Sequence, residues 1–168
     1  MDEKCREIIW KQFGAALDTL ENAIVNCPDE TWGDSRGYHA YWYMVYHTIF
    51  WLDYYLADSW EDYRPPAPFT LGEMDPEGVL PDRVYTKEEM LDFLKIGGNN
   101  ARKLIATMDE ERAERPYKFR KAQISTAELI LYSMRHLQHH SAQLNLLLRQ
   151  KHDQGSPWAA ISKVGLRD

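Results

Sequence analysis

Apolar residues recur at spacings of three and four in four long segments of the chain. These segments cover residues 2–26, 38–60, 86–109 and 125–151. Such spacing places the apolar side chains on one face of an α-helix, so each segment is predicted to be helical. The second segment is rich in aromatic residues, which also suit a strand, but its length of 23 residues favours a helix. No segment is convincing as a strand, and the expected fold class is all-α.

Local signals mark where several of these helices begin and end. Pro28 stops the first helix, because proline cannot continue a helical hydrogen-bond ladder. Thr86 with Glu89, and Ser125 with Glu128, have the spacing of a capping box, in which each side chain accepts from the backbone N–H of the other residue. The third and fourth helices are therefore predicted to start at these residues.

The segment between the second and third helices, residues 61–85, contains five prolines and no periodicity. An extended chain of this length reaches roughly 80 Å, whereas a helix of 23 residues spans only about 35 Å. The segment can therefore run along the whole second helix and set the third helix parallel to it. We expect residues 1–168 to form a single four-helix bundle domain with a long crossover between the second and third helices.

Two smaller features complete the predicted architecture. Gly97 and Gly98 each weaken the middle of the third helix by about 1 kcal/mol, which predicts a local bend there. The tail from Asp153 onward has no helical pattern. We expect it to be an irregular arm held in place by Trp158 and Ile161.

Composition and charge exclude several classes of function. The net charge is −6 and the basic residues form no long run, so a nucleic-acid partner is not expected. No apolar stretch is long enough to span a membrane, and the first ten residues are charged where a signal peptide would be apolar. We therefore expect a cytoplasmic protein with no membrane partner.

The two cysteines, Cys5 and Cys27, are too few and too oddly placed for a disulfide framework. Cys27 lies near a helix C-terminus, where the negative end of the helix dipole raises the pKa of a thiol. Activation needs a helix N-terminus or a cationic neighbour instead. Cys27 is thus a poor candidate for a nucleophile.

Histidines are concentrated on the faces of two predicted helices. His136 and His140 are four residues apart, about 40° around the helix axis, so both rings can approach one point. His139 points about 100° away from His140 and is expected to face outward. His47 lies mid-helix in an apolar stripe and is the candidate third member. His39 is expected to cap a helix or lie on the surface.

Two interpretations of these histidines remain open. They can be hydrogen-bonded or surface residues without a ligand, and His152 at the end of the fourth helix is expected to be solvated. Alternatively, a metal ion satisfies all three mid-helix rings, since burying an unpaired polar group costs about 1–3 kcal/mol. Three imidazoles leave a coordination position open, which is typical of catalytic rather than structural sites.

Other helical metal motifs do not fit the sequence. A zincin motif needs glutamate directly after its first histidine, and Leu137 stands there. Di-iron bundles need Glu-x-x-His pairs, which do not occur in this chain. The remaining pattern is one histidine on the second helix and a pair four residues apart on the fourth.

This pattern resembles the DinB-like superfamily of metal-binding four-helix bundles. "HLQHHSAQL", from His136 to Gln143, is similar to the fourth-helix motif of that family, and "YHTIFWLDYYL" is similar to the second-helix segment around His47. Helix order and the long crossover are also similar. Where many relatives have Arg-Gly before the glutamine, this chain has Ser141 and Ala142, a difference expected to affect local packing more than metal binding.

The resemblance implies that His47, His136 and His140 bind a divalent ion, commonly zinc or nickel. Relatives include bacillithiol transferases and a mycothiol-dependent maleylpyruvate isomerase, which implies a low-molecular-weight thiol as cosubstrate and an electrophilic small molecule as substrate. A metal-coordinated thiol is deprotonated, whereas a free thiol at neutral pH is mostly protonated. By the same resemblance a homodimer is expected, with exposed aromatics on the first two helices as its surface.

Three hypotheses follow. The first is a metal-dependent enzyme, either a thiol S-transferase or a hydrolase that activates water. The second is a non-catalytic bundle that uses the ion for stability or as a binding or stress-response module. The third is a bundle whose histidines only form hydrogen bonds. Gln143, one turn beyond His140, either orients a metal-bound ligand or bridges two helices. The aromatic segment "GYHAYWYMVYH", residues 37–47, indicates either a pocket for a flat or apolar ligand or, more commonly, packing in the core or at an interface.

Overall fold

Four long helices dominate the computed structural model, which describes residues 1–34, 37, 39–119 and 121–167. The long helices are α1 (Glu3–Val25), α3 (Tyr41–Tyr55), α4 (Lys87–Ala106) and α6 (Thr126–His152). The shorter elements are α2 (Asp29–Trp32), the 3₁₀ helix η1 (Leu71–Met74), α5 (Glu110–Glu114), β1 (Pro116–Phe119) and β2 (Ala122–Ser125). The fold is mostly helical, in agreement with the predicted class.

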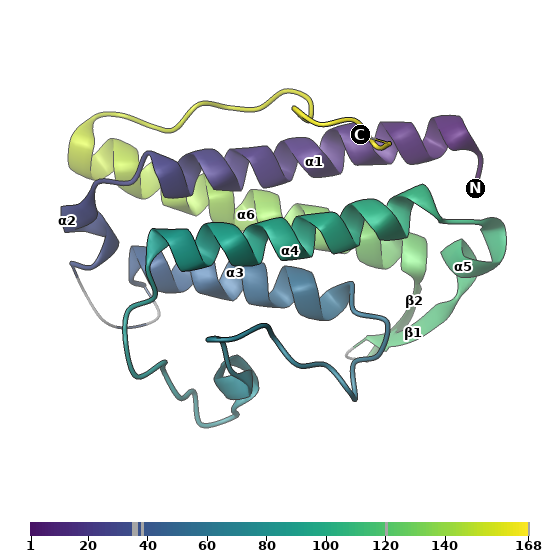
Figure 1. The fold of residues 1–168 in the computed structure, drawn as a ribbon, viewed down its shortest axis with the longest axis horizontal. Helices are drawn as coiled ribbons and strands as arrows, with labels where there is room; N and C mark the ends of the chain where they lie inside the picture. The colour runs from purple at the N-terminus through teal and green to yellow at the C-terminus, as the bar shows by residue number, and fades with distance from the viewer. Residues whose placement is uncertain (35–36, 38, 120, 168) are drawn as a thin grey trace.

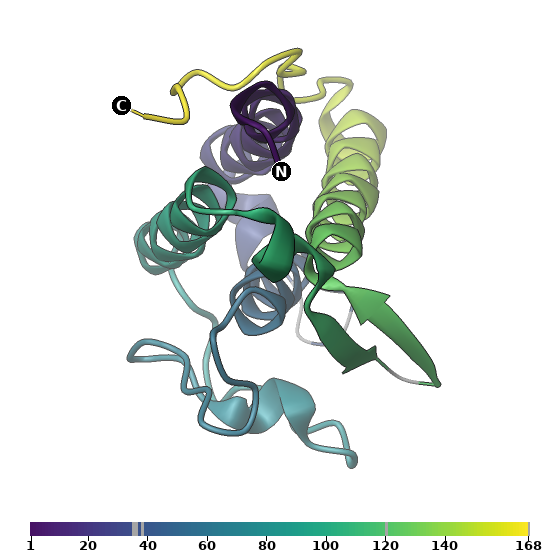
Figure 2. The ribbon, with the colours of Figure 1, turned by 90° about the vertical axis from the view of Figure 1, so that its right-hand side faces the viewer.

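The long helices pack side by side around one apolar core. α1 contacts α4 and α6, and α3 contacts the same two helices. Figure 1 shows that α3 and α4 run in the same direction, while α1 and α6 run the opposite way. The crossover between α3 and α4, which contains η1, lies on the outer side of α3 (Figure 2). The core is rich in rings, and Phe13, Trp42, Tyr46, Phe50 and Phe93 are almost fully buried.

The predicted capping boxes are confirmed. The Thr86 side chain accepts from the backbone N–H of Glu89, whose carboxylate accepts from the N–H of Thr86. Ser125 and Glu128 form the same pair at the start of α6. Each box satisfies backbone donors that the first turn of a helix leaves without a helical acceptor.

α3 is shorter than the predicted helix over residues 38–60. Its first helical residue is Tyr41 and its last is Tyr55; residue 38 lies outside the described part of the chain. The Trp60 indole N–H donates to the carbonyl of Tyr55 at 3.4 Å. Trp60, the last aromatic residue of the predicted helix, therefore lies past the end of α3, and its ring folds back against the helix end. Hydrophobic periodicity alone did not distinguish these two arrangements.

The prediction that no strand occurs is wrong. β1 and β2 form an antiparallel hairpin in which Pro116 pairs with Ser125 and Phe119 with Ala122. Each strand has only four residues, and β1 alternates between exposed and half-buried positions. Strands this short are too brief for an alternating hydrophobic pattern to stand out from a loop.

α4 runs through Gly97 and Gly98 as one α-helix, and the glycines have a packing role. A Cβ added at Gly97 would lie 3.2 Å from a methyl carbon of Leu52, and one at Gly98 would lie 3.4 Å from a methyl carbon of Leu17. The missing side chains let α4 approach α3 and α1 closely. This close approach accounts for two residues that are unfavourable in a helix interior.

The C-terminal tail is irregular, as predicted, but different residues hold it. Trp158 and Ile161 are 71% and 64% exposed, so the expectation that they pack the tail is wrong. Figure 1 shows the tail running along α1. It is held there mainly by hydrogen bonds to α1, including one from the Trp10 indole to the carbonyl of Val164 at 2.8 Å.

The surface of α1 also departs from the expectation for a dimer. Trp10 and Phe13, its two aromatic residues, are 5% and 0% exposed, so α1 presents no aromatic surface. Its exposed large apolar residues are Ile8 and Val25. Along the described residues, no helix has the length and apolar character needed to cross a bilayer.

Candidate metal centre

Three histidine rings from two helices converge at one place. His47 comes from α3, and His136 and His140 come from α6. One ring nitrogen of each lies within 4.8 Å of the others. The ring centroids of His47 lie 5.3 Å from His136 and 4.8 Å from His140. The structure thus brings together the three residues that the sequence singled out as ligands.

Hydrogen bonds fix which nitrogen of His140 carries its proton. Nδ1 of His140 lies 2.8 Å from the amide oxygen of Gln143, which can only accept. His140 therefore donates through Nδ1, and its Nε2 keeps a lone pair. This Nε2 lies 3.2 Å from Nε2 of His136. Gln143, predicted either to orient a ligand or to bridge helices, instead orients a histidine on its own helix.

A buried carboxylate does the same for His47. Nδ1 of His47 lies 2.5 Å from Oε1 of Glu73, whose side chain is only 5% exposed. Because an ionised carboxylate only accepts, Nδ1 carries the proton and Nε2 is left with its lone pair. The Trp51 indole also donates to Oε1, at 3.1 Å, and the Tyr43 hydroxyl donates to Oε2 at 2.6 Å. A carboxylate behind a histidine in this way is typical of metal sites, where it fixes the ring and increases its basicity.

The crossover between α3 and α4 positions Glu73. Its 3₁₀ helix η1 is capped by Thr70, whose hydroxyl accepts from the N–H of Gly72 at 3.3 Å. The Tyr46 hydroxyl donates to the carbonyl of Thr70 at 3.2 Å. The ring of Phe69 stacks on Phe93 with centroids 4.4 Å apart. These contacts tie the proline-rich segment to the core just before the residue that reaches His47.

Glu73 was not predicted from the sequence, although a signal for an acceptor was present. Tyr43, His47 and Trp51 are spaced four residues apart, so their three donors lie on one face of α3. Three partly buried donors in a row require an acceptor. The sequence does not say which residue supplies it, since Glu73 is 26 residues from His47 in an irregular segment.

The electrostatic environment keeps His140 neutral. Burial is the largest of the effects that lower the pKa of His140 to about 4, and the electrostatic effect of the neighbouring His47 acts in the same direction. The hydrogen bond to Gln143 opposes this shift only in part. At neutral pH the ring is therefore uncharged, which is the form that binds metal ions.

The donor set fits a divalent cation. Two nitrogens bound to one tetrahedral zinc at about 2.0–2.1 Å would be roughly 3.3–3.4 Å apart. Nε2 of His136 and Nε2 of His140 are 3.2 Å apart. Three imidazoles suit zinc or nickel better than magnesium or calcium, which prefer oxygen ligands. The three rings can hold such an ion without any carboxylate or thiolate among them.

Two cavities meet at the histidines. One, of about 390 Å³, lies on the side of Tyr43, Glu73 and Gln143. The other, of about 610 Å³, lies on the side of Trp51 and the β hairpin. His47 and His140 line both cavities. An ion held by these rings would therefore be accessible from two directions.

The other histidines lie elsewhere. His39 is exposed and lines the outer part of the smaller cavity, and His139 is exposed on α6 as predicted. His152 is not simply solvated, which corrects the expectation. Its Nε2 lies 2.6 Å from the Thr31 hydroxyl and links the end of α6 to α2.

Cys27 takes no part in this centre. It is 2% exposed, and burial raises the pKa of its thiol to about 12. The thiol is therefore protonated and shielded at neutral pH, in agreement with the expectation that it is not a nucleophile.

The family model of the DinB superfamily matches residues 12–144, which include the second-helix histidine and the paired histidines. The chain belongs to the DinB superfamily. This confirms the resemblance noted in the sequence, and metal binding is frequent among members of the DinB superfamily. Searches of curated proteins and of solved structures gave no match. In this chain, the geometry favours the three histidines as the functional site.

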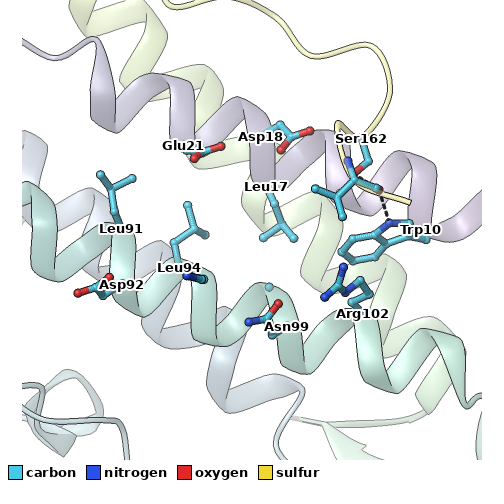
Figure 3. A pocket seen from close by; sticks show the side chains of 14 residues that line it. Trp10, Leu17, Asp18, Glu21, Leu91, Asp92, Leu94, Asn99, Arg102 and Ser162 are labelled. Atoms are coloured by element: carbon cyan, nitrogen blue, oxygen red, sulfur yellow. Dashed lines mark hydrogen bonds between the residues drawn. The ribbon is translucent and has the colours of Figure 1, made fainter. Parts of the chain in front are cut away.

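This DinB-superfamily chain also has a groove of about 470 Å³ between α1 and α4. Figure 3 shows Asp18 and Glu21 on one wall, Asp92 and Arg102 on the other, and Ser162 of the tail at one end. The backbone N–H of Lys163 donates to Asp18 at 2.7 Å. The groove combines charges of both signs and binds the chain's own tail.

Proposed function

We propose that the chain is a metal-dependent enzyme in which a divalent ion, zinc or nickel, activates a small-molecule thiol or water for attack on a small electrophile. The bundle of four helices serves as the rigid frame that holds ligands on α3 and α6. The observation that carries the proposal is the convergence of three oriented imidazoles at the junction of two cavities.

His47, His136 and His140 are the proposed ligands, each through Nε2. Glu73 and Gln143 hold the Nδ1 protons of His47 and His140, so these two rings present a lone pair to the ion. When bound, the ion supplies a positive charge that lowers the pKa of a coordinated thiol or water. The role of the protein is to fix the rings, keep His140 neutral and leave room for two reactants.

The two cavities support a reaction with two small reactants. A thiol and an electrophile must approach the same centre from different sides. The smaller cavity carries polar groups such as His39, Tyr43 and Gln143, which suit a polar thiol cosubstrate. The larger one has aromatic walls. A site with a single entrance would be harder to reconcile with thiol transfer than with hydrolysis.

A second candidate function is a non-catalytic bundle stabilised by the ion. The observation that favours it is that the ligands belong to different helices, so a bound ion would tie α3 to α6. A ligand that binds only the folded state raises stability by mass action. Both functions share the metal site and differ in whether reactants use it.

The test begins with protein repleted with zinc or nickel and analysed for bound metal. The proposal predicts about one ion per chain. The repleted protein is then assayed with bacillithiol, mycothiol, cysteine and coenzyme A against a panel of electrophiles. Thiol-dependent turnover that chelation and His140→Ala both abolish supports the enzyme. A silent panel, with a sharp loss of thermal stability on chelation, supports the non-catalytic bundle instead.

A homodimer remains part of the proposal. Its surface is not the aromatic face of α1 that the sequence suggested, because that face is buried. Light scattering on the metal-loaded protein, at several concentrations, tests this point: a mass near twice 19.7 kDa is expected.

A further inference from the structure

The larger cavity beside the histidines is walled by aromatic rings. It has a volume of about 610 Å³, within the range of small-molecule sites. Its aromatic lining residues come from α3, the segment after α3, β1 and α6: Trp51, Tyr54, Tyr55, Trp60, Phe119 and Tyr132. Among the described residues that line it, none is aliphatic. A wall whose apolar side chains are all aromatic is unusual, because most apolar pockets mix rings with leucine, isoleucine or valine.

Two pairs among these rings, one stacked and one tilted, are closer to parallel than to perpendicular. The planes of Tyr54 and Trp60 are 24° apart with centroids at 5.5 Å, and those of Trp51 and Tyr55 are 31° apart at 5.3 Å. Trp51, Tyr54 and Trp60 are only partly buried, so part of each ring remains available. Ring surfaces of this kind favour a flat π system, which can extend the stacking, over a flexible chain.

These rings differ from the aromatic residues that face the other way on α3. Trp42, Tyr46 and Phe50 are at most 1% exposed and belong to the core. Trp51 and Tyr54 lie on the part of the helix that faces the cavity. The core-packing interpretation of the aromatic segment is confirmed for Trp42 and Tyr46, and the ligand-pocket interpretation stays a prediction.

One charged side chain in the cavity further restricts the kind of ligand that the cavity can bind. Lys118, on β1, lines the cavity, and no carboxylate is among its described lining residues. The chain as a whole carries a net charge of −6, so a general attraction for anions is absent. A local ammonium group beside aromatic walls selects for a ligand that combines a flat ring with an acidic group.

We propose that this cavity binds a planar aromatic anion. The ring of the ligand stacks on the Trp51, Tyr54 and Trp60 side, and its acidic group pairs with Lys118. The inference rests on the proposed function in so far as this ligand is the electrophilic substrate of the enzyme. Binding of the ring itself requires only the cavity walls and not the metal ion.

The test uses naphthalene-2-sulfonate, a flat aromatic anion whose sulfonate is a poor metal ligand. Isothermal titration calorimetry measures its binding to the zinc-loaded protein and to protein treated with a chelator. We expect one site per chain in both preparations, with dissociation constants within about threefold of each other. Cyclohexanesulfonate, which lacks a π system, and naphthalene-2-sulfonamide, which lacks the charge, are expected to bind at least about tenfold more weakly.

Two substitutions examine the two halves of the site. Trp60→Leu removes one ring of the wall and should weaken binding about tenfold, as loss of a stacking partner does. Its matched control is Trp158→Leu, which removes an exposed tryptophan of the tail and should change nothing. Lys118→Met should weaken binding and abolish the preference for the sulfonate over the sulfonamide. Lys121→Met, an exposed lysine in the same hairpin, is its control.

The outcomes separate this inference from the proposed function. Binding of the probe to protein that takes up no zinc or nickel on repletion supports the cavity while removing the enzyme. Stoichiometric metal without probe binding overturns the cavity and leaves the enzyme intact. The inference is also overturned if cyclohexanesulfonate binds as tightly as the aromatic probe, or if both lysine variants keep the sulfonate preference. If Trp60→Leu does not fold, Lys118→Met still tests the inference.

Discussion

The histidine centre and the groove between α1 and α4 are both hollow, yet they differ in what their polar groups face. At the histidine centre, three rings of one type point to a common place, and Glu73 and Gln143 orient two of them from behind. In the groove, Asp18 is used by the tail, and Glu21 forms an ion pair with Lys163. The volumes, about 470 Å³ in the groove and about 390 and 610 Å³ at the histidines, do not distinguish the two regions.

The convergence of polar groups on one point, rather than the volume of a cavity, therefore distinguishes the histidine centre from the groove. Polar groups that hydrogen-bond or pair with one another within the chain have few donors or acceptors left for a ligand. At the histidine centre, the hydrogen bonds to Glu73 and Gln143 lie on the far side of the His47 and His140 rings, so Nε2 of each ring faces the common point. Substitutions at the histidine centre and in the groove should therefore have different effects.

Removing a ring of the histidine centre should have the largest effect. His136→Ala should abolish stoichiometric binding of zinc or nickel, measured by elemental analysis after repletion and gel filtration. His139→Ala, three residues along and exposed, should retain a full equivalent. In the groove, Asp92→Asn should also leave metal content unchanged. If the His136 variant retains metal while the His139 variant loses it, the ligand assignment is wrong.

Removing the carboxylate behind His47 should have the next largest effect. Glu73→Gln keeps the size of the side chain and removes the charge that holds the Nδ1 proton. We expect metal affinity to fall about 10- to 100-fold, as for other partners of metal-bound histidines. Competition with a chromophoric chelator measures the change. Glu77→Gln, at an exposed position in the same segment, is the matched control; equal affinities of the two variants would show that Glu73 does not orient His47.

In the groove, the expected effect is on stability and not on metal. A Cβ at Gly14 would overlap the Ser162 side chain of the tail. Alanine is a better helix former than glycine by about 1 kcal/mol, but the clash should cancel this gain or reverse it. A double-mutant cycle of Gly14→Ala with Ser162→Gly should give a coupling free energy of about 1 kcal/mol in urea unfolding. Purely additive effects would mean that the tail does not pack on α1.

The smallest expected effect is on the pH dependence of stability, and it involves Asp53, a second buried carboxylate, on α3. Asp53 accepts from Tyr63 at 3.0 Å and from Asn100 at 3.1 Å. Burial raises the pKa of Asp53 above 3.8, and these hydrogen bonds oppose the shift only in part. The folded state therefore binds the proton more tightly than the unfolded state does. Stability contributed by this group is lost as pH rises from the unfolded pKa through the folded pKa.

Asp53→Asn has no such titration, so its stability relative to the unsubstituted protein should increase over that acidic window and then stay constant to neutral pH. Urea unfolding in the presence of a chelator, at pH values from acidic to neutral, measures the difference. A variant that loses stability relative to the unsubstituted protein as pH rises would show that the hydrogen bonds from Tyr63 and Asn100 outweigh the effect of burial. Metal affinity should not change.

The sequence predicted those features of the fold that depend on residues close together along the chain. The capping boxes at Thr86 and Ser125 involve residues three apart, and both are present. The His136–His140 pair is likewise set by one turn of helix. The end of the second helix was misplaced because Leu56 and Trp60 continue its helical pattern of apolar residues, although both lie beyond the last helical residue, Tyr55.

Features that depend on distant contacts could not be predicted. Glu73 reaches His47 through a segment without periodicity, so only its tertiary position reveals its role. The exposure of Trp158 shows that a large apolar residue in a tail need not be its anchor. The aromatic cavity needs α3, α6 and the β hairpin together, and the hairpin strands are too short to be recognised.

The most direct test of the central claim is anomalous diffraction, at the absorption edge of the metal, from crystals of zinc-repleted protein. The account predicts one anomalous peak at about 2.0–2.1 Å from Nε2 of His47, His136 and His140, with the remaining coordination facing the two cavities. Glu73 and Gln143 should stay on Nδ1 of their histidines. An absent peak, or a peak whose fourth ligand is a protein side chain such as Glu73, would contradict a catalytic centre open to two reactants.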